Sequence, residues 1–186
     1  PPPPTTSSAA SDVYKRQEIY EQPDALGNTI NGRLGEHDVL DNIFGLGSSD
    51  AFKNVKRIQF VACGTSLHAA KTARKWFEEI CEIPCYIDFA SEYRYRNPIV
   101  EDHTLFVTIS QSGETADTLA ALEYARAEKY VGIVTICNVP TSTMARNADW
   151  KIFTNAGPEI GVASTKAFTT QLACLLYTSD AADEVL

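Results

Sequence analysis

The side chains best suited to chemistry in this sequence belong to the segment 110–115, which reads Ser-Gln-Ser-Gly-Glu-Thr. It follows the apolar run 104–109 with no spacer. Residues this polar cannot build a core, but their hydroxyl and backbone N–H groups are donors that can hold an anion. Gly113 would let the backbone close around a phosphate. We therefore predict that 110–115 forms a phosphate cup. Glu114 could act as a base, but we favour a role in capping the start of a helix.

Two further loops have the same hydroxyl-rich composition. Residues 63–66, Cys-Gly-Thr-Ser, follow another apolar run, and residues 162–165, Val-Ala-Ser-Thr, precede the last expected helix. A lone serine or threonine at a helix start usually only caps that helix, so neither loop indicates a ligand by itself. Lys166 could pair with a phosphate, although we expect this side chain to be exposed. For His68 we expect a surface or packing role.

Apolar runs and helical patterns alternate along the chain, and these elements must position the three loops. Five strands are expected, at 57–63, 85–89, 104–109, 131–137 and 150–154. Helices are expected at 67–80, with Ser66 or Thr65 as the N-cap, at 115–129, near 141–147, and from 163–166 onward.

The central strands are apolar on both faces, as in a parallel sheet that is covered by helices on both sides. The sequence therefore predicts the α/β class, with a three-layer αβα sandwich around a five-stranded, mainly parallel sheet. In such a sheet the loops at the carboxyl ends of the strands meet at one crevice, where ligands bind. We expect the three hydroxyl-rich loops to meet there.

Composition narrows the choice of partners and cofactors. The chain has 186 residues and a net charge of −8, so we expect neither a nucleic-acid partner nor an anionic membrane surface. No apolar run is long enough for a membrane span, and we expect a cytoplasmic protein. The five cysteines lack metal-pair spacing and read as reduced core thiols. With no glycine-rich nucleotide signature either, we expect no metal and no other cofactor.

The two ends of the chain match one DNA element read in opposite directions. Residues 12–17 can be encoded by GAT GTG TAT AAG AGA CAG, whose reverse complement, read one base along, encodes Cys-Leu-Leu-Tyr-Thr and begins the serine of 174–179. The match continues outward through 7–11 and 180–184. We expect 1–17 and 174–186 to be non-native tails translated from a sequencing adapter. Residues 18–52 would form a helical lead-in and 53–173 the main domain, truncated at its end.

Three motifs, in this order and spacing, resemble a known family. They are "CGTS" at 63–66, "SQSGETADT" at 110–118 and "EIGVASTKAFTTQ" at 159–171. Together they are similar to the sugar isomerase (SIS) domain of the glutamine:fructose-6-phosphate aminotransferases (isomerizing), the glucosamine-6-phosphate synthases. The "IYEQP" of 19–23 and "ASEYRYRNP" of 90–98 are similar to further segments of that family.

The resemblance implies the SIS fold and a set of residues that bind the sugar phosphate. That set is Thr65, Ser66, Ser110, Gln111, Ser112, Thr115, Val162 and Ser164. No residue of the family's catalytic machinery matches a position between 18 and 173, so we expect a fragment that binds weakly and catalyses nothing. Cys63 follows a strand of the sugar domain and is not expected to be the glutaminase nucleophile.

The family's reaction converts fructose 6-phosphate and glutamine to glucosamine 6-phosphate and glutamate, as a step of amino-sugar synthesis. The resemblance implies that glutamine is used only through a separate glutaminase domain, and that the parent enzyme is a homodimer. Two alternatives stay open at this point. One is a noncatalytic SIS module that senses phosphosugars in a regulator, and the other is a standalone phosphosugar isomerase.

Overall fold

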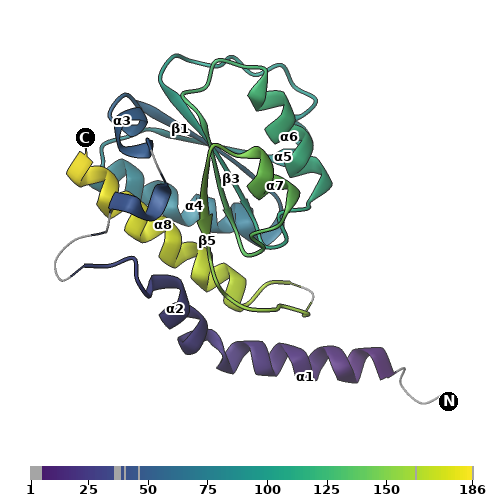
Figure 1. The fold of residues 1–186 in the computed structure, drawn as a ribbon. Helices are drawn as coiled ribbons and strands as arrows, with labels where there is room; N and C mark the ends of the chain where they lie inside the picture. The colour runs from purple at the N-terminus through teal and green to yellow at the C-terminus, as the bar shows by residue number, and fades with distance from the viewer. Residues whose placement is uncertain (1–5, 36–38, 40, 46, 162, 186) are drawn as a thin grey trace.

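The fold is known from a computed structural model, which describes residues 6–35, 39, 41–45, 47–161 and 163–185. A single sheet stands at the centre, with helices on either side (Figure 1). None of the helices in the described ranges is both long and apolar enough to cross a bilayer.

Five strands form the sheet in the order β2-β1-β3-β4-β5, and every neighbouring pair is parallel. The strands are β1 (Arg57–Ala62), β2 (Cys85–Phe89), β3 (Thr104–Ser110), β4 (Ile133–Cys137) and β5 (Trp150–Phe153). The predicted α/β class and five-stranded sheet are therefore confirmed. Because β1 is followed by β2 on one side and by β3 on the other, the strand order reverses between β1 and β3, where open sheets of this type bind ligands.

Helices cover both faces of the sheet. They are α1 (Thr6–Tyr20), α2 (Gln22–Ile30), α3 (Ser48–Phe52), α4 (Gly64–Ile80), α5 (Ala90–Tyr93), α6 (Ala116–Arg126), α7 (Thr143–Asn147) and α8 (Lys166–Val185), with a 3-10 turn η1 (Asp41–Phe44). Figure 1 shows α4 and α8 side by side on one face, and α5, α6 and α7 on the other. This is the expected three-layer arrangement.

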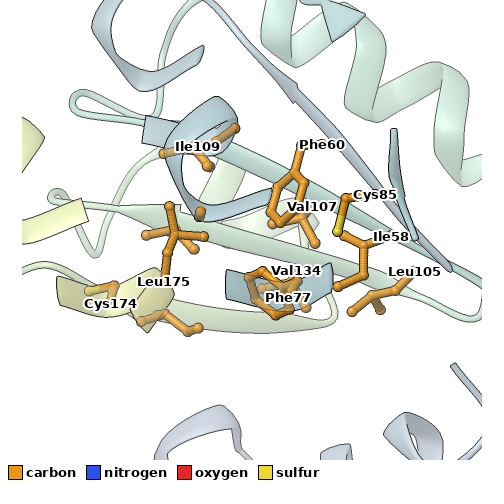
Figure 2. Close-up of a cluster of buried hydrophobic side chains, with 14 of the residues drawn as sticks. Ile58, Phe60, Phe77, Cys85, Leu105, Val107, Ile109, Val134, Cys174 and Leu175 are labelled. Atoms are coloured by element: carbon orange, nitrogen blue, oxygen red, sulfur yellow. The ribbon is translucent and has the colours of Figure 1, made fainter. Parts of the chain in front are cut away.

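The strand side chains alternate between two buried clusters, one on each face. Phe60 packs into the cluster under α4 and α8, while its neighbour Val61 packs into the cluster under α5 and α6. On β3, Val107 and Phe106 divide in the same way. Figure 2 shows Phe60 and Val107 in the first cluster, with Phe77 close by. Successive strand residues point to opposite faces, and both faces are covered, which is why most positions of these strands are apolar.

The first sheet helix begins earlier than its apolar pattern predicts. Cys63 is its N-cap, in an extended conformation and with no side-chain capping bond, so the expected cap at Ser66 or Thr65 is wrong. Gly64 makes this start possible because it adopts a φ of 56°, which an L-residue tolerates poorly. Thr65 and Ser66 therefore lie inside the first turn of α4, and neither hydroxyl is used as the cap.

The helices at the two ends run through the segments expected to be non-native. α1 includes residues 6–17, and α8 continues from 174 to Val185. Cys174, Leu175 and Tyr177 are buried against the domain. Apolar residues at helical spacing pack in this way whatever DNA encoded them, so the boundaries at 17 and 174 stay predictions.

Candidate functional site

A pocket of about 430 Å³ opens at the carboxyl ends of β1 and β3, where the strand order reverses. Three segments far apart in the chain form its walls: the start of α4, the loop after β3, and the loop before α8. Its lining residues are Cys63, Gly64, Thr65, Ser66, Ile109, Ser110, Gln111, Ser112, Thr115, Ala163 and Ser164. The expected meeting of the three hydroxyl-rich loops is found at this pocket.

The pocket gathers almost all of the residues predicted to bind the sugar phosphate. Val162 lies outside the described residues, and every other member of that set lines the pocket. The sequence did not single out Ile109 and Ala163, which also line it, because an apolar or small side chain carries no chemical signal. Ligand contact by any of these residues stays a prediction.

The loop after β3 is shaped by its own hydroxyls. Ser110 Oγ accepts a hydrogen bond from the backbone N–H of Gly113 at 3.0 Å and lies 3.2 Å from Thr115 Oγ1. Ser112 Oγ accepts from the N–H of Glu114 at 3.1 Å. A hydroxyl that accepts a bond keeps its own hydrogen for donation. The loop is thus held in place by bonds that leave Ser112 able to donate to a ligand.

Glu114 ties the loop after β3 to the start of α7. Its Oε1 accepts a hydrogen bond from the backbone N–H of Thr143 at 2.7 Å, at the first turn of α7. Hydrogen bonds from the Thr143 backbone and side chain hold the pKa of Glu114 below its usual range, and Arg146 adds to this effect. Glu114 is therefore a capping residue, as favoured from the sequence, but the helix it caps is α7 rather than α6.

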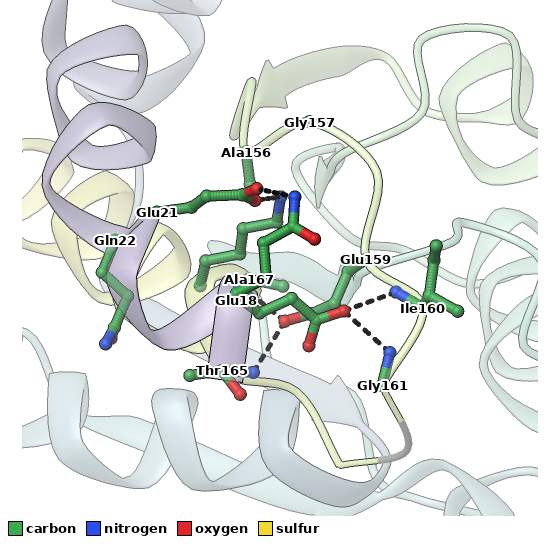
Figure 3. Close-up of polar contacts among 12 residues, drawn as sticks. Glu18, Glu21, Gln22, Ala156, Gly157, Glu159, Ile160, Gly161, Thr165 and Ala167 are labelled. Atoms are coloured by element: carbon green, nitrogen blue, oxygen red, sulfur yellow. Dashed lines mark hydrogen bonds and ion pairs between the residues drawn. The ribbon is translucent and has the colours of Figure 1, made fainter. Parts of the chain in front are cut away.

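Glutamate side chains hold the loop before α8, which forms the third wall. Glu18 is buried, and its Oε1 accepts from the backbone N–H groups of Ile160 and Gly161, each at 2.7 Å. Glu159 Oε1 accepts from the N–H of Thr165 at 2.6 Å (Figure 3). Glu18 thus holds the backbone before the pocket residues Ala163 and Ser164, and Glu159 holds the backbone after them. The Glu18 contact could not be predicted from the sequence, since it joins segments 142 residues apart.

Lys166 does not have the exposed position expected for it. Its side chain is only 5% exposed, and its Nζ lies 2.6 Å from Glu21 Oε2. Figure 3 shows Glu21 extending from the helical lead-in toward the segment that carries Ala156. Hydrogen bonds from Lys166 and Gln17 lower the pKa of Glu21, and the bond from Lys166 has the larger effect. Lys166 is a structural residue that joins the lead-in to α8, and it does not line the pocket.

None of the described residues that line the pocket is a lysine, an arginine, a histidine or a carboxylate. His68 is exposed on α4 and lies outside the lining. No cluster of histidine, cysteine and acidic residues suited to a metal ion occurs in the described ranges. The donors available to a ligand are therefore neutral hydroxyl, amide and N–H groups, placed at the N-terminal ends of α4 and α6. Such an arrangement suits an anion that is held by hydrogen bonds and helix dipoles.

Curated relatives share much of this sequence. The glutamine--fructose-6-phosphate aminotransferase [isomerizing] of Idiomarina loihiensis is 56% identical over 160 residues, which are 86% of this chain and 26% of that protein. The protein of the same name from Pseudomonas syringae pv. tomato is 54% identical with the same coverage. The chain thus spans about a quarter of the length of these relatives.

Solved structures and a family profile agree with these matches. The C-terminal domain of glucosamine-fructose-6-phosphate aminotransferase from Francisella tularensis superposes with a TM-score of 0.90 at 47% identity, over 92% of this chain and 48% of that one. A glucosamine-6-phosphate deaminase from Thermotoga maritima, at 20% identity and a TM-score of 0.73, over 92% of this chain and 49% of that one, shares the fold. The profile of the SIS domain matches residues 51–178. The chain therefore belongs to the SIS domain family.

Proposed function

We propose that this chain is the phosphosugar-binding half of the isomerase domain of a glutamine:fructose-6-phosphate aminotransferase (isomerizing), an enzyme of amino-sugar synthesis. Its ligands are fructose 6-phosphate and glucosamine 6-phosphate. The observation that carries the proposal is the pocket, in which loops from three motifs meet as a lining of neutral donors. The relatives at 50–56% identity support the choice of enzyme.

The phosphate would sit in the loop after β3. Ser110, Ser112 and Thr115 surround it with hydroxyls, and the backbone of Gln111 adds an N–H group at the end of β3. Bonds from neutral donors to an ionised phosphate are short and about twice as strong as bonds between neutral groups. Thr65 and Ser66, on the opposite wall, would contact the phosphate and the sugar chain. Val162 and Ser164 would reach the sugar hydroxyls.

We place the chemistry of the parent enzyme outside this chain. Among the lining residues that the structure describes, none is an acid, base or amine that could open the sugar ring or form a Schiff base. In the parent, glutamine would supply ammonia through a glutaminase domain, a second SIS half would complete the sugar site, and two copies would form a homodimer in the cytoplasm. The 186-residue protein alone would bind sugar phosphate weakly without turning it over.

Calorimetric titration of the 186-residue protein with fructose 6-phosphate tests the proposal. Fructose without a phosphate is the matched control, and we expect it not to bind. Ser112→Ala removes a charge-assisted bond of about 1.5–3 kcal/mol, which corresponds to a loss of roughly 10- to 150-fold in affinity. Equal affinity of the variant and the wild type for fructose 6-phosphate would contradict the phosphate cup.

A further inference from the structure

Gln171 has a buried side-chain amide that contacts a pocket residue without lining the pocket itself. It lies on α8, the residue is 1% exposed, and its Nε2 donates a hydrogen bond to Ser66 Oγ at 3.1 Å. Ser66 lies in the first turn of α4 and lines the pocket. The bond therefore connects a residue outside the pocket to a hydroxyl inside it, across 105 residues of sequence.

Stability alone does not account for an amide at this position. Gln171 Oε1 is buried and has no hydrogen-bond partner among the described residues. An unsatisfied buried acceptor costs about 1–3 kcal/mol. The surrounding contact between α4 and α8 is made by apolar side chains such as Leu67, Ala70 and Leu175. A leucine or methionine at 171 would fill a similar volume with no orphaned polar atom.

The bond to Gln171 determines what the Ser66 hydroxyl can do. A serine hydroxyl has one hydrogen to donate and two lone pairs that accept. Accepting from Gln171 fixes the orientation of the oxygen and occupies a lone pair, while the hydrogen stays free. Within the described part of the chain, Ser66 Oγ has no other hydrogen-bond partner. Because Ser66 lines the pocket, its hydrogen is available to an anion that binds there.

From this geometry we infer that Gln171 is a positioning residue, whose amide orients the Ser66 hydroxyl to donate to the phosphate or sugar oxygen of the bound ligand. The inference rests on the proposed function, because it needs a phosphosugar in the pocket. It extends that function to a residue that touches no ligand. Gln171 is the last residue of the motif "EIGVASTKAFTTQ", and its bond to Ser66 gives that residue a role in the pocket.

A double-mutant cycle tests the inference on the 186-residue protein, with the dissociation constant for fructose 6-phosphate as the readout. We expect Gln171→Leu to weaken binding by about 3- to 10-fold, the size of one neutral hydrogen bond. In the Ser66→Ala background the same substitution should change the affinity by less than about twofold, because the hydroxyl that it orients is gone. Melting temperature should stay equal or rise in Gln171→Leu, since an orphaned acceptor is removed.

Two further variants separate orientation from packing. Gln171→Glu keeps the size of the side chain but replaces the donor by an acceptor, so it should take the Ser66 hydrogen and weaken binding more than leucine does. It also provides a readout if the leucine variant does not fold. Thr170→Ala is the matched control, because Thr170 is buried on the same helix but, among the described residues, bonds only to the carbonyls of Lys166 and Ala167. We expect its affinity to equal that of the wild type.

The outcomes distinguish failure of the inference from failure of the proposed function. An equal loss from Gln171→Leu with and without the Ser66 hydroxyl, or no loss in either background, would overturn the positioning role. If Ser112→Ala still weakened binding in that case, the phosphate cup would stand without Gln171. If the wild type bound no fructose 6-phosphate at all, both the proposed function and the inference would be wrong.

Discussion

Gly113 and Ser142 are in such close contact that a methyl group does not fit between them. A Cβ built on Gly113 would lie 2.2 Å from Ser142 Oγ and 2.5 Å from Ser142 Cβ. Gly113 also adopts a φ of 66°, and its carbonyl accepts a hydrogen bond from the N–H of Met144 at 3.1 Å. The loop after β3 is thus docked directly on the start of α7, and only glycine permits this approach.

Gly113→Ala should therefore destabilise the protein and weaken ligand binding. Left-handed backbone costs an L-residue about 1–2 kcal/mol, and overpacking against Ser142 adds about 1–3 kcal/mol. We expect a loss of about 2–5 kcal/mol in the free energy of unfolding, measured by urea denaturation. Gly64→Ala is the matched control, because Gly64 has a φ of 56° but nothing within 4 Å of an added Cβ. A loss as large at Gly64 as at Gly113 would show that the contact with Ser142 is unimportant.

The pair formed by Glu21 and Lys166 should respond unequally to removal of either partner. Lys166 is 5% exposed and Glu21 is 36% exposed, so the lysine depends more on its partner. Glu21→Gln leaves a buried ammonium without its carboxylate, whereas Lys166→Met leaves a carboxylate that water can reach. We expect a larger fall in melting temperature for Glu21→Gln, with partial recovery in the double variant. The reverse order would contradict this account of the pair.

The accessible thiol at the pocket should report on ligand binding. Cys63 lines the pocket and is half-buried, whereas Cys85 is buried beneath the sheet helices. We expect fructose 6-phosphate to slow the alkylation of Cys63 by iodoacetamide, followed residue by residue with mass spectrometry. Fructose alone should give no protection. Cys63 alkylation at the same rate with and without saturating sugar phosphate would place the ligand elsewhere.

Cys85 should make stability fall at alkaline pH. Burial raises the pKa of its thiol from 9.0 to about 12, with Glu78 adding to the shift. Between these values the unfolded chain releases the proton while the folded chain keeps it, so the free energy of unfolding decreases as the pH rises. The stability that the protonated Cys85 thiol contributes is fully present below pH 9 and is lost as the pH rises toward 12. Urea titrations from pH 7 to 10.5 should show a shallower decline in Cys85→Ala, and an identical decline would refute the assignment.

The sheet could be predicted because its signal is local. Phe60 and Val61 pack on opposite faces, so consecutive apolar residues such as those at 60–62 of β1 indicate a strand covered on both sides. The meeting of the loops followed from the parallel direction of the strands, which brings their carboxyl ends to one edge. The first turn of α4 was harder to predict, since a positive φ at Gly64 leaves no trace in a hydrophobic pattern.

The contacts that sequence reasoning missed join distant parts of the chain. Lys166 looks exposed in its own segment, but in the fold it is buried and pairs with Glu21, which lies 145 residues away. Gln171 reads as a polar helix residue until α4 packs beside it and presents Ser66. Nothing within a few residues of Lys166 or Gln171 predicts these partners, which are determined by tertiary packing.

The third wall of the pocket belongs to the loop that leads into α8, whereas the first two walls follow strands of the sheet. Ligand affinity would therefore depend on a helix whose undocking breaks no strand pairing. Such a local opening of α8 would empty the pocket while the sheet stayed intact. A bound sugar phosphate would in turn keep this helix docked, so amide hydrogen exchange in α8 would slow on binding while exchange in β1 and β3 stayed at its native rate.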